Sequence, residues 1–409
     1  MLISKALPVA TQRVVTLLVL LLSGYVGSGR AAVPIPPTLL PIESTADRMI
    51  SYRHQEHMWQ TSDGATHVLV NVGDDSPGAS LVLYSTFDSG LTWQPMFSVT
   101  GSEYYSTSDG RIVNDMLGIV FGTAAGNVAY AAYRYNATAS TWTPVLGEIV
   151  FSQEGQWAFN PAFALDSSGA IWCAFVVRNE STSQTNIRMM VRPNNGMGVW
   201  QNTGLTFGPT DALQVERSAR PVPTSNGVGM IYTVHDTMYW STRIDGAAVT
   251  APWNTSTLFA APPPYNADPY ASHFSVVADL QKNLHVAAVD NGRLIYIRYV
   301  NSSKTWQAPR ALTSGDVRAT YPQISYSGGA IIIASNVSNS AGVLQSTDKG
   351  TTWAYTHLLE HPAAAEGEDY NNPRIEMPGY SASPIPVMQQ YQVGERFELM
   401  LFPVPVLPE

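Results

Sequence analysis

Short apolar runs separated by turn-forming residues recur along the chain and predict strands rather than helices. Three such runs occupy residues 171–177, 284–289 and 330–334, and Gly, Asn and Asp punctuate the segments around them. Short runs rich in β-branched and aromatic side chains have the length and composition of single strands. Because they repeat at close spacing, they predict an all-β fold.

One phrase occurs twice and predicts a particular kind of turn. Residues 86–93 read TFDSGLTW and residues 346–353 read STDKGTTW, so both follow Ser/Thr-x-Asp-x-Gly-x-Thr-Trp. In a hairpin turn, Asp would accept backbone N–H groups, Gly would adopt a positive φ, and Thr-Trp would begin the next strand. We expect each Trp to pack into the blade of its own hairpin. The phrase resembles the Asp-box of sialidases and related β-propellers, which implies a propeller with both turns on its periphery.

Tryptophan spacing extends the two turns into a repeat. Successive intervals of 49, 58, 53, 53 and 47 residues are typical of propeller blades. The residues that define these intervals are Trp93, Trp142, Trp200, Trp253, Trp306 and Trp353.

The segment after the last of these tryptophans can supply most of another blade. It contains strand candidates at residues 385–390 and 396–404, and a strand expected from Pro36 to Ala46 would close the ring beside them. The sequence therefore favours a β-propeller of seven four-stranded antiparallel blades. Six blades, as in sialidases proper, is the alternative.

Composition indicates one compact domain without a nucleic-acid surface. The chain is 45% hydrophobic and only 13% charged, and its net charge of −9 argues against a nucleic-acid surface. A local arginine cluster can still attract an acidic glycan. No linker or low-complexity stretch interrupts the repeats, so residues 32–409 are predicted to form a single propeller domain.

The N-terminus has the pattern of a secretory signal peptide. Lys5 and Arg13 precede the apolar run 14–22, and small residues follow as far as Ala31-Ala32. The apolar run is far shorter than the ~20 residues that a spanning helix needs. Residues 1–31 are therefore predicted to be a cleaved leader, and the mature chain is predicted to be secreted or periplasmic.

Candidate ligand groups lie where the innermost strand of each blade begins. These strands start at one face of the central channel, where arginine and aromatic residues dominate. Guanidinium groups pair with carboxylates through parallel hydrogen bonds, so the pattern predicts an acidic carbohydrate, with sialic or uronic acid. The candidates are Arg53, His54, Glu216, Arg217, His273, Arg318, Tyr321 and Arg374.

Residues 52–93 resemble the opening blade of bacterial sialidases. A Tyr-Arg pair begins the first strand, a Gly-Asp loop follows at residues 73–78, and a strand then leads to the first Asp-box. The resemblance implies that Arg53 belongs to an arginine triad that grips the substrate carboxylate. It also implies that Asp75 or Asp74 is the acid/base.

The same resemblance assigns roles further along the chain. Glu216 would be the Glu that pairs with a Tyr nucleophile, Tyr321 is the best nucleophile candidate, and Arg374 is the best remaining triad arginine. The chain also departs from the family. His54-Gln55 stands where the family has Ile-Pro, and residues 229–235 contain no arginine. These departures favour a relative over a working sialidase.

Polysaccharide lyases that act on uronate-containing chains are a second propeller group, seven-bladed and similar to sialidases in fold. Their β-elimination needs a group that neutralises the uronate carboxylate, and a His or Tyr pair that moves protons. The resemblance here is one of fold and residue type, without a lyase motif. The matching residue types are Arg53, Arg217, His54, His57, His273 and Tyr321.

A non-catalytic glycan- or protein-binding propeller is the alternative to an enzyme. Such a module would show exposed aromatic shelves without a convergent proton-transfer pair, whereas an enzyme would gather arginines and an acid/base around one sugar. His54-x-x-His57 lacks a helical context and partner ligands, so neither a metal nor a cofactor is predicted. We expect a monomer with no nucleic-acid partner and, after signal cleavage, no membrane partner.

Overall fold

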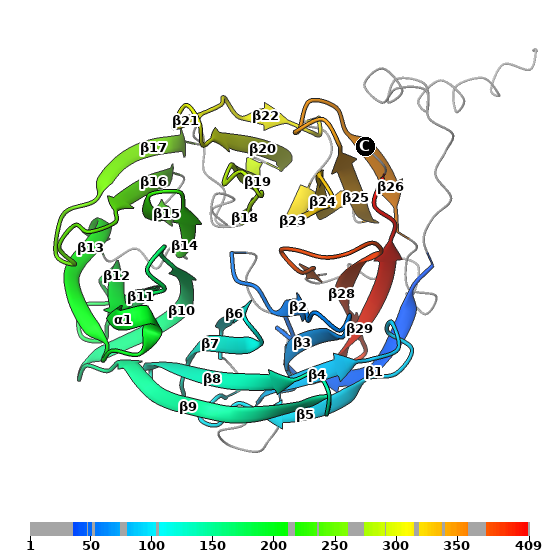
Figure 1. Ribbon diagram of the computed structural model, residues 1–409, viewed down its shortest axis with the longest axis horizontal. Helices are drawn as coiled ribbons and strands as arrows, with labels where there is room; N and C mark the ends of the chain where they lie inside the picture. The colour runs from blue at the N-terminus through cyan, green and yellow to red at the C-terminus, as the bar shows by residue number, and fades with distance from the viewer. Residues whose placement is uncertain are drawn as a thin grey trace, which may run out of the picture.

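Seven antiparallel sheets stand radially around a central axis and form a closed β-propeller (Figure 1). The computed structural model describes residues 36–407 except 47, 51–53, 74–79, 104–105, 212–216, 235–236, 261–273, 291, 315–318, 338–339 and 359–373. Each sheet has four strands, and one carries an additional short strand. The prediction of seven four-stranded blades is confirmed, and the six-bladed alternative is wrong.

Each of blades one to six takes its strands from consecutive chain, from the axis outwards. Blades one to three comprise β2 (Met58–Gln60), β3 (Thr66–Asn71), β4 (Leu81–Thr86) and β5 (Gln94–Ser98); β6 (Ser108–Val113), β7 (Met116–Gly122), β8 (Val128–Asn136) and β9 (Thr141–Phe151); and β10 (Gln156–Leu165), β11 (Ile171–Asn179), β12 (Thr185–Arg192) and β13 (Gln201–Asp211). Blades four to six comprise β14 (Ser218–Thr224), β15 (Gly227–Val234), β16 (Thr237–Ile244) and β17 (Asn254–Ala260); β18 (Phe274–Ala278), β19 (Leu284–Asp290), β20 (Arg293–Val300), β21 (Thr305–Trp306) and β22 (Arg310–Ala311); and β23 (Ala319–Ser327), β24 (Ala330–Val337), β25 (Ser340–Ser346) and β26 (Ala354–His357).

Blade seven joins the two ends of the described chain. Its inner three strands are β27 (Ile375–Glu376), β28 (Ile385–Val393) and β29 (Arg396–Val404), and its outermost strand is β1 (Thr38–Ser44). Thr38 faces Leu401 and Ser44 faces Phe397 in the antiparallel register. The expected closing strand is therefore confirmed.

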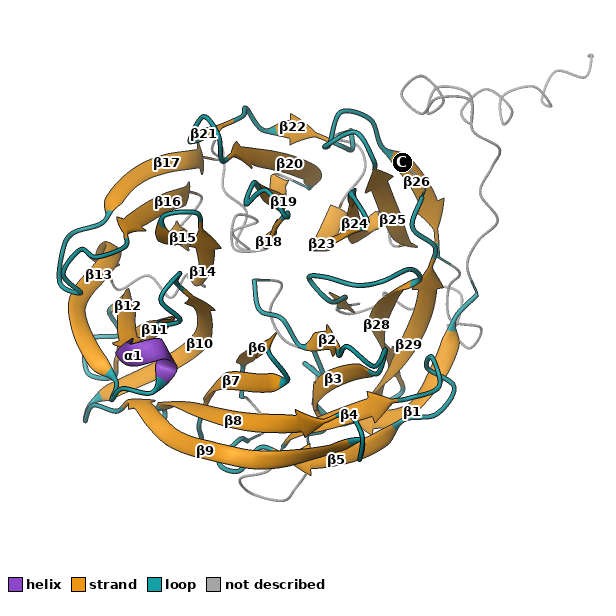
Figure 2. Ribbon diagram, in the orientation of Figure 1, coloured by secondary structure: helices purple, strands orange, loops and turns teal. Residues whose placement is uncertain are grey.

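Helical structure is almost absent from the described residues (Figure 2). The helix α1 (Pro193–Gly196) is a single turn between β12 and β13. No helix in the described ranges is long and apolar enough to cross a membrane.

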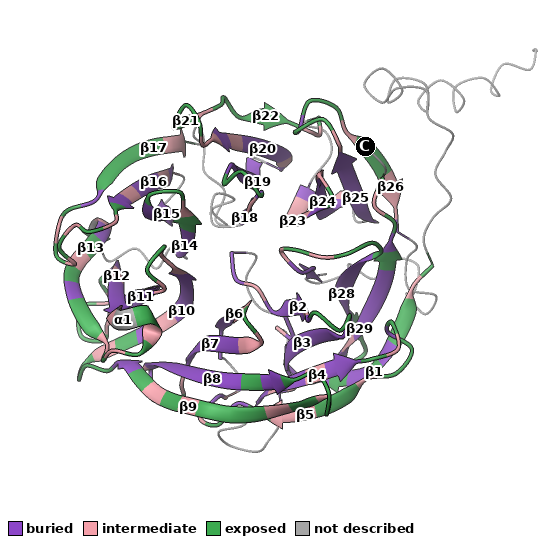
Figure 3. Ribbon diagram, in the orientation of Figure 1, coloured by how far each residue is buried: buried purple, intermediate pink, exposed green. Residues whose placement is uncertain are grey.

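The hydrophobic core is divided into seven clusters, each shared by two neighbouring blades. Inner strands are largely buried, whereas the outermost β9 and β17 are mainly exposed (Figure 3). Because every blade buries one face against each neighbour, no blade has a complete core of its own, as in other repeat architectures.

The repeating tryptophans connect adjacent blades. The Trp353 ring meets Tyr296 of the preceding blade edge to face, with centroids 5.1 Å apart. Trp306 meets Trp240 at 5.4 Å in the same way. Trp306 also meets Tyr299 of its own blade at 5.1 Å, so these side chains pack into their own blades, as expected, and against the preceding blade as well.

Both copies of the repeated phrase form the same hairpin turn between the third and fourth strands of a blade. In the first, Asp88 Oδ1 accepts the Thr92 N–H at 2.9 Å, and the Gly90 N–H donates to Thr86 Oγ1 at 2.8 Å. The second copy repeats these bonds around Asp348. Gly90 has a φ of 94°, which confirms the expected left-handed position.

Candidate functional site

The chain segment 54–57 crosses the centre of the propeller. This segment precedes β2, and the blue loop before that strand lies at the middle of the ring (Figure 1). The His54 ring stacks on Phe274 of blade five, with centroids 5.9 Å apart. Gln55 Nε2 donates to the Pro161 carbonyl of blade three at 2.7 Å. The segment therefore plugs the channel instead of forming part of its wall.

Glu56 is the centre of an ionic network between three blades. Its Oε2 accepts hydrogen bonds from Arg111 Nη1 of blade two at 2.9 Å and from Arg220 Nη2 of blade four at 3.4 Å. Both guanidinium groups also bind Asp109 Oδ1, Arg111 at 3.1 Å and Arg220 at 2.5 Å. Asp109 Oδ2 accepts the Phe163 N–H of blade three. Two carboxylates and two guanidinium groups thus neutralise one another around the plug.

Burial dominates the protonation of the two acids. Loss of hydration raises the pKa of Glu56 to about 7, although Arg111 acts in the opposite direction. Asp109 adds a like charge beside Glu56. The pKa of Asp109 is itself raised, again mainly by burial, with Arg111 opposing. Burial thus favours the neutral form of both acids, and the arginines favour the charged form.

A second buried pair links blades one and seven. His57 Nδ1 lies 3.1 Å from Glu376 Oε2, and the His57 N–H donates to Glu376 Oε1 at 3.1 Å. His57 Nε2 lies 2.7 Å from the Ser108 carbonyl. Because a carbonyl only accepts, Nε2 carries a proton, and another proton lies between Nδ1 and the carboxylate. Three contacts, through the main-chain N–H and both ring nitrogens, therefore hold His57 in position.

We expect Glu56→Gln to change the pH dependence of stability. Because the folded pKa of Glu56 is raised above its ordinary value of 4.5, its contribution to the free energy of unfolding is lost as pH rises towards and past 7. The amide of the variant does not ionise and escapes this loss, so the variant should gain about 3 kcal/mol relative to the wild type between about pH 4.5 and about pH 8.

Urea unfolding of both proteins across this pH range measures the difference directly. Glu398→Gln, in the outer part of blade seven, is the matched control. The raised pKa would be contradicted if the difference in free energy of unfolding between wild type and variant stayed constant with pH. It would also be contradicted if that difference shifted in favour of the wild type as pH rises.

Three predicted ligand residues lie buried at the starts of innermost strands. Arg217 precedes β14 and is 1% exposed, Arg374 precedes β27 and is 4% exposed, and His54 is 1% exposed. They belong to blades four, seven and one. The structure thus buries all three side chains, each at or just before the start of the innermost strand of a different blade.

Tyr321 occupies a backbone irregularity in the innermost strand of blade six. Its φ is 56°, an outlier for a bulky residue, and the pairing of β23 with β24 shifts register between Thr320 and Gln323. Asn160 of blade three has a φ of 51° at a corresponding register shift. Bulges re-aim side chains and occur near active sites, so Tyr321 keeps its place as a candidate.

Six of the predicted site residues lie outside the described residues, so their roles stay predictions. They are Arg53, Asp74, Asp75, Glu216, His273 and Arg318. Within the described ranges, no group of three or more His, Cys, Asp or Glu side chains is placed to hold a metal ion.

Sequence reasoning missed the residues that fill the middle of the channel. Asp109, Arg111, Arg220 and Glu376 all lie on innermost strands. Their charges are the signal that could have identified them, since charged residues are rarely buried without partners. Finding the partners required the strand registers, which determine which side of each strand faces the axis.

Sequence comparison leaves this chain without a recognised relative. No protein-family model matches it, and no curated protein matches it either. Comparison of structures finds many similar folds.

Solved structures with similar folds include three proteins that bind or act on carbohydrates. An ulvan lyase bound to -[GlcA(1-4)Rha3S]-, described as a new family of polysaccharide lyase, has a TM-score of 0.54 at 12% identity; the match covers 90% of this chain and 96% of that chain. The lectin of Aleuria aurantia in complex with Fucalpha1-6GlcNAc has a TM-score of 0.48 at 12% identity, covering 77% and 99%. The Trypanosoma rangeli sialidase has a TM-score of 0.48 at 12% identity, covering 81% and 56%. At these identities the likeness concerns the β-propeller fold alone.

Proposed function

We propose that this protein is a secreted polysaccharide lyase that cleaves uronate-containing glycans by β-elimination. The observation that supports the proposal is that Arg217, Arg374 and His54 are all buried at or just before the starts of innermost strands in a seven-bladed propeller. Seven blades favour a lyase over a sialidase, because sialidases proper have six. The likeness in fold to an ulvan lyase supports the same choice as analogy.

The chemistry assigns a separate task to each group. A guanidinium of Arg217 or Arg374 binds the uronate carboxylate and stabilises negative charge that develops on it, which lowers the pKa of the adjacent C–H. A base, for which His54 is the described candidate, removes that proton, the electron pair forms the C=C bond, and the bond from the β carbon to the glycosidic oxygen breaks. The leaving oxygen receives a proton, for which Tyr321 is the described candidate.

The experiment is turnover on a panel of acidic glycans by the full-length mature protein. Alginate, polygalacturonate, hyaluronan, chondroitin sulfate and ulvan are the uronate substrates, and sialyllactose is the comparison. Ultraviolet absorbance of unsaturated uronate should rise with at least one uronate polymer. Release of free sialic acid instead would replace the lyase with a sialidase-like hydrolase.

A binding propeller is the second candidate, and the central network favours it. Glu56 and Asp109 are both bound by Arg111 and Arg220, so the carboxylates in the described middle of the channel already have cationic partners. Such fully paired charges are what a channel with a structural role, and no catalytic one, would contain. Retained binding of an acidic polymer without turnover on any substrate would establish this candidate and overturn the lyase.

A further inference from the structure

A hollow lies on the face of the propeller opposite the starts of the innermost strands. The first-to-second strand turns of blades one, five and six line it, together with the loop that follows β27 in blade seven. Its volume of about 690 Å³ falls in the range of small-molecule sites. The residues that matter for recognition are Gln60, Leu280, Gln281, Tyr326, Tyr380 and Ser381.

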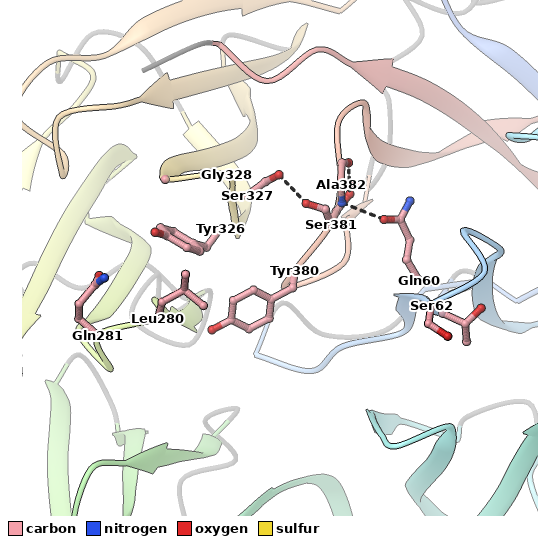
Figure 4. A pocket seen from close by; sticks show the side chains of 12 residues that line it. Gln60, Ser62, Leu280, Gln281, Tyr326, Ser327, Gly328, Tyr380, Ser381 and Ala382 are labelled. Atoms are coloured by element: carbon pink, nitrogen blue, oxygen red, sulfur yellow. Dashed lines mark hydrogen bonds between the residues drawn. The ribbon is translucent and has the colours of Figure 1, made fainter.

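The wall of this hollow combines aromatic surface with uncharged polar groups. Tyr380 is 50% exposed, and its ring meets Tyr326 edge to face with centroids 6.2 Å apart. Figure 4 shows Tyr380 at the centre, with Tyr326 and Gln281 on one side and Gln60 on the other. The lining contains no Asp, Glu, Lys, Arg or His side chain among the described residues. A charged ligand would therefore find no lining counter-charge.

The loop that carries Tyr380 is held in place from both sides. The Gly379 carbonyl accepts a hydrogen bond from the main chain of β23 at 3.0 Å, and the Ala382 N–H donates to Gln60 Oε1 at 3.1 Å. The Tyr380 hydroxyl donates to the Ala278 carbonyl of blade five. A ring fixed before binding loses little conformational entropy when a ligand stacks on it.

We propose that this hollow binds a neutral pyranose unit of a glycan chain. The apolar C–H face of the sugar lies on the Tyr380 ring, and the sugar hydroxyls bond with the Gln281 amide, which can both donate and accept. Gln60 offers them its second amide N–H, since its Oε1 accepts from Ala382 and its Nε2 also donates to Thr66. Leu280, which is 76% exposed, covers the edge of the sugar. The site is separate from Arg217 and Arg374 and does not depend on catalysis there.

Calorimetric titration with neutral hexasaccharides of the cellulose, xylan and mannan backbones tests the proposal. We expect saturable binding of at least one of them, and about a tenfold weaker affinity in Tyr380→Ala, as expected for loss of an aromatic contact. Tyr355→Ala removes a tyrosine of similar exposure (39%) from the outermost strand β26 and is the matched control. Gln281→Ala is a second variant at an exposed position.

Three results would overturn the proposal. They are the absence of saturable binding by all three hexasaccharides at millimolar concentration, equal affinities in Tyr380→Ala and Tyr355→Ala, and equal competition by oligogalacturonates. Thermal melts of each variant confirm folding. Because turnover of uronate polymers is assayed separately, Tyr380→Ala with unchanged turnover and lost neutral-sugar binding separates this site from the proposed catalytic one.

Discussion

Tyr321→Phe is expected to lower the rate of uronate elimination by about a hundredfold or more, the usual cost of losing a general acid or base. The substitution removes only the phenolic oxygen and leaves the ring to hold the bulge at the start of β23. Initial rates from unsaturated-uronate absorbance, at saturating and limiting polymer, separate the change in kcat from the change in KM.

The matched control is Tyr355→Phe, which removes the same atom from an outermost strand. It should leave both kinetic constants unchanged. If Tyr321→Phe retained most of the wild-type kcat, Tyr321 would not be the proton carrier. A raised KM with an unchanged kcat would instead assign Tyr321 to substrate positioning.

Glu376→Ala should lower the free energy of unfolding by about 3–5 kcal/mol, because it leaves a buried imidazole without its carboxylate partner. Glu376 is fully buried. Its carboxylate accepts a hydrogen bond from the main-chain N–H of His57 and contacts the ring nitrogen Nδ1 of the same residue. Gln323 Nε2 lies 3.4 Å from the same carboxylate. Urea unfolding, followed by tryptophan fluorescence, measures the loss.

A double-mutant cycle with His57→Ala distinguishes the pair from simple loss of packing. In the His57→Ala background, Glu376→Ala should cost less, since the imidazole that it would strand is gone. Equal costs in the two backgrounds would show that the two side chains are not coupled. Glu376→Gln, which keeps the shape and one acceptor, should be milder than Glu376→Ala.

The blade count was predictable from the sequence because it depends on local signals at regular spacing. Tryptophan intervals and the repeated turn phrase mark the outermost hairpins of blades, and the strand near the N-terminus completes the ring as expected. The turns were predictable in detail, since their hydrogen bonds join residues only four positions apart, as in Asp88 and Thr92.

The channel network was not predictable for the opposite reason. Glu56 and Arg220 are 164 residues apart, and His57 and Glu376 are 319 residues apart. Their meeting depends on the order of blades around the ring and on which residues of each innermost strand face the axis. A shift of one residue in register would reverse that choice, and no local pattern specifies it.

The pairing of β1 with β29 also constrains when the protein can fold during its synthesis. A ribosome makes Thr38–Ser44 long before Arg396–Val404, so β1 must wait for β29 before the two can pair. Closing so long a loop is slow, and incomplete rings expose apolar blade faces. If the chain is exported as proposed, this delay would keep the ring open until β29 has been made, so that the preceding polypeptide could pass through a translocation pore in an extended form.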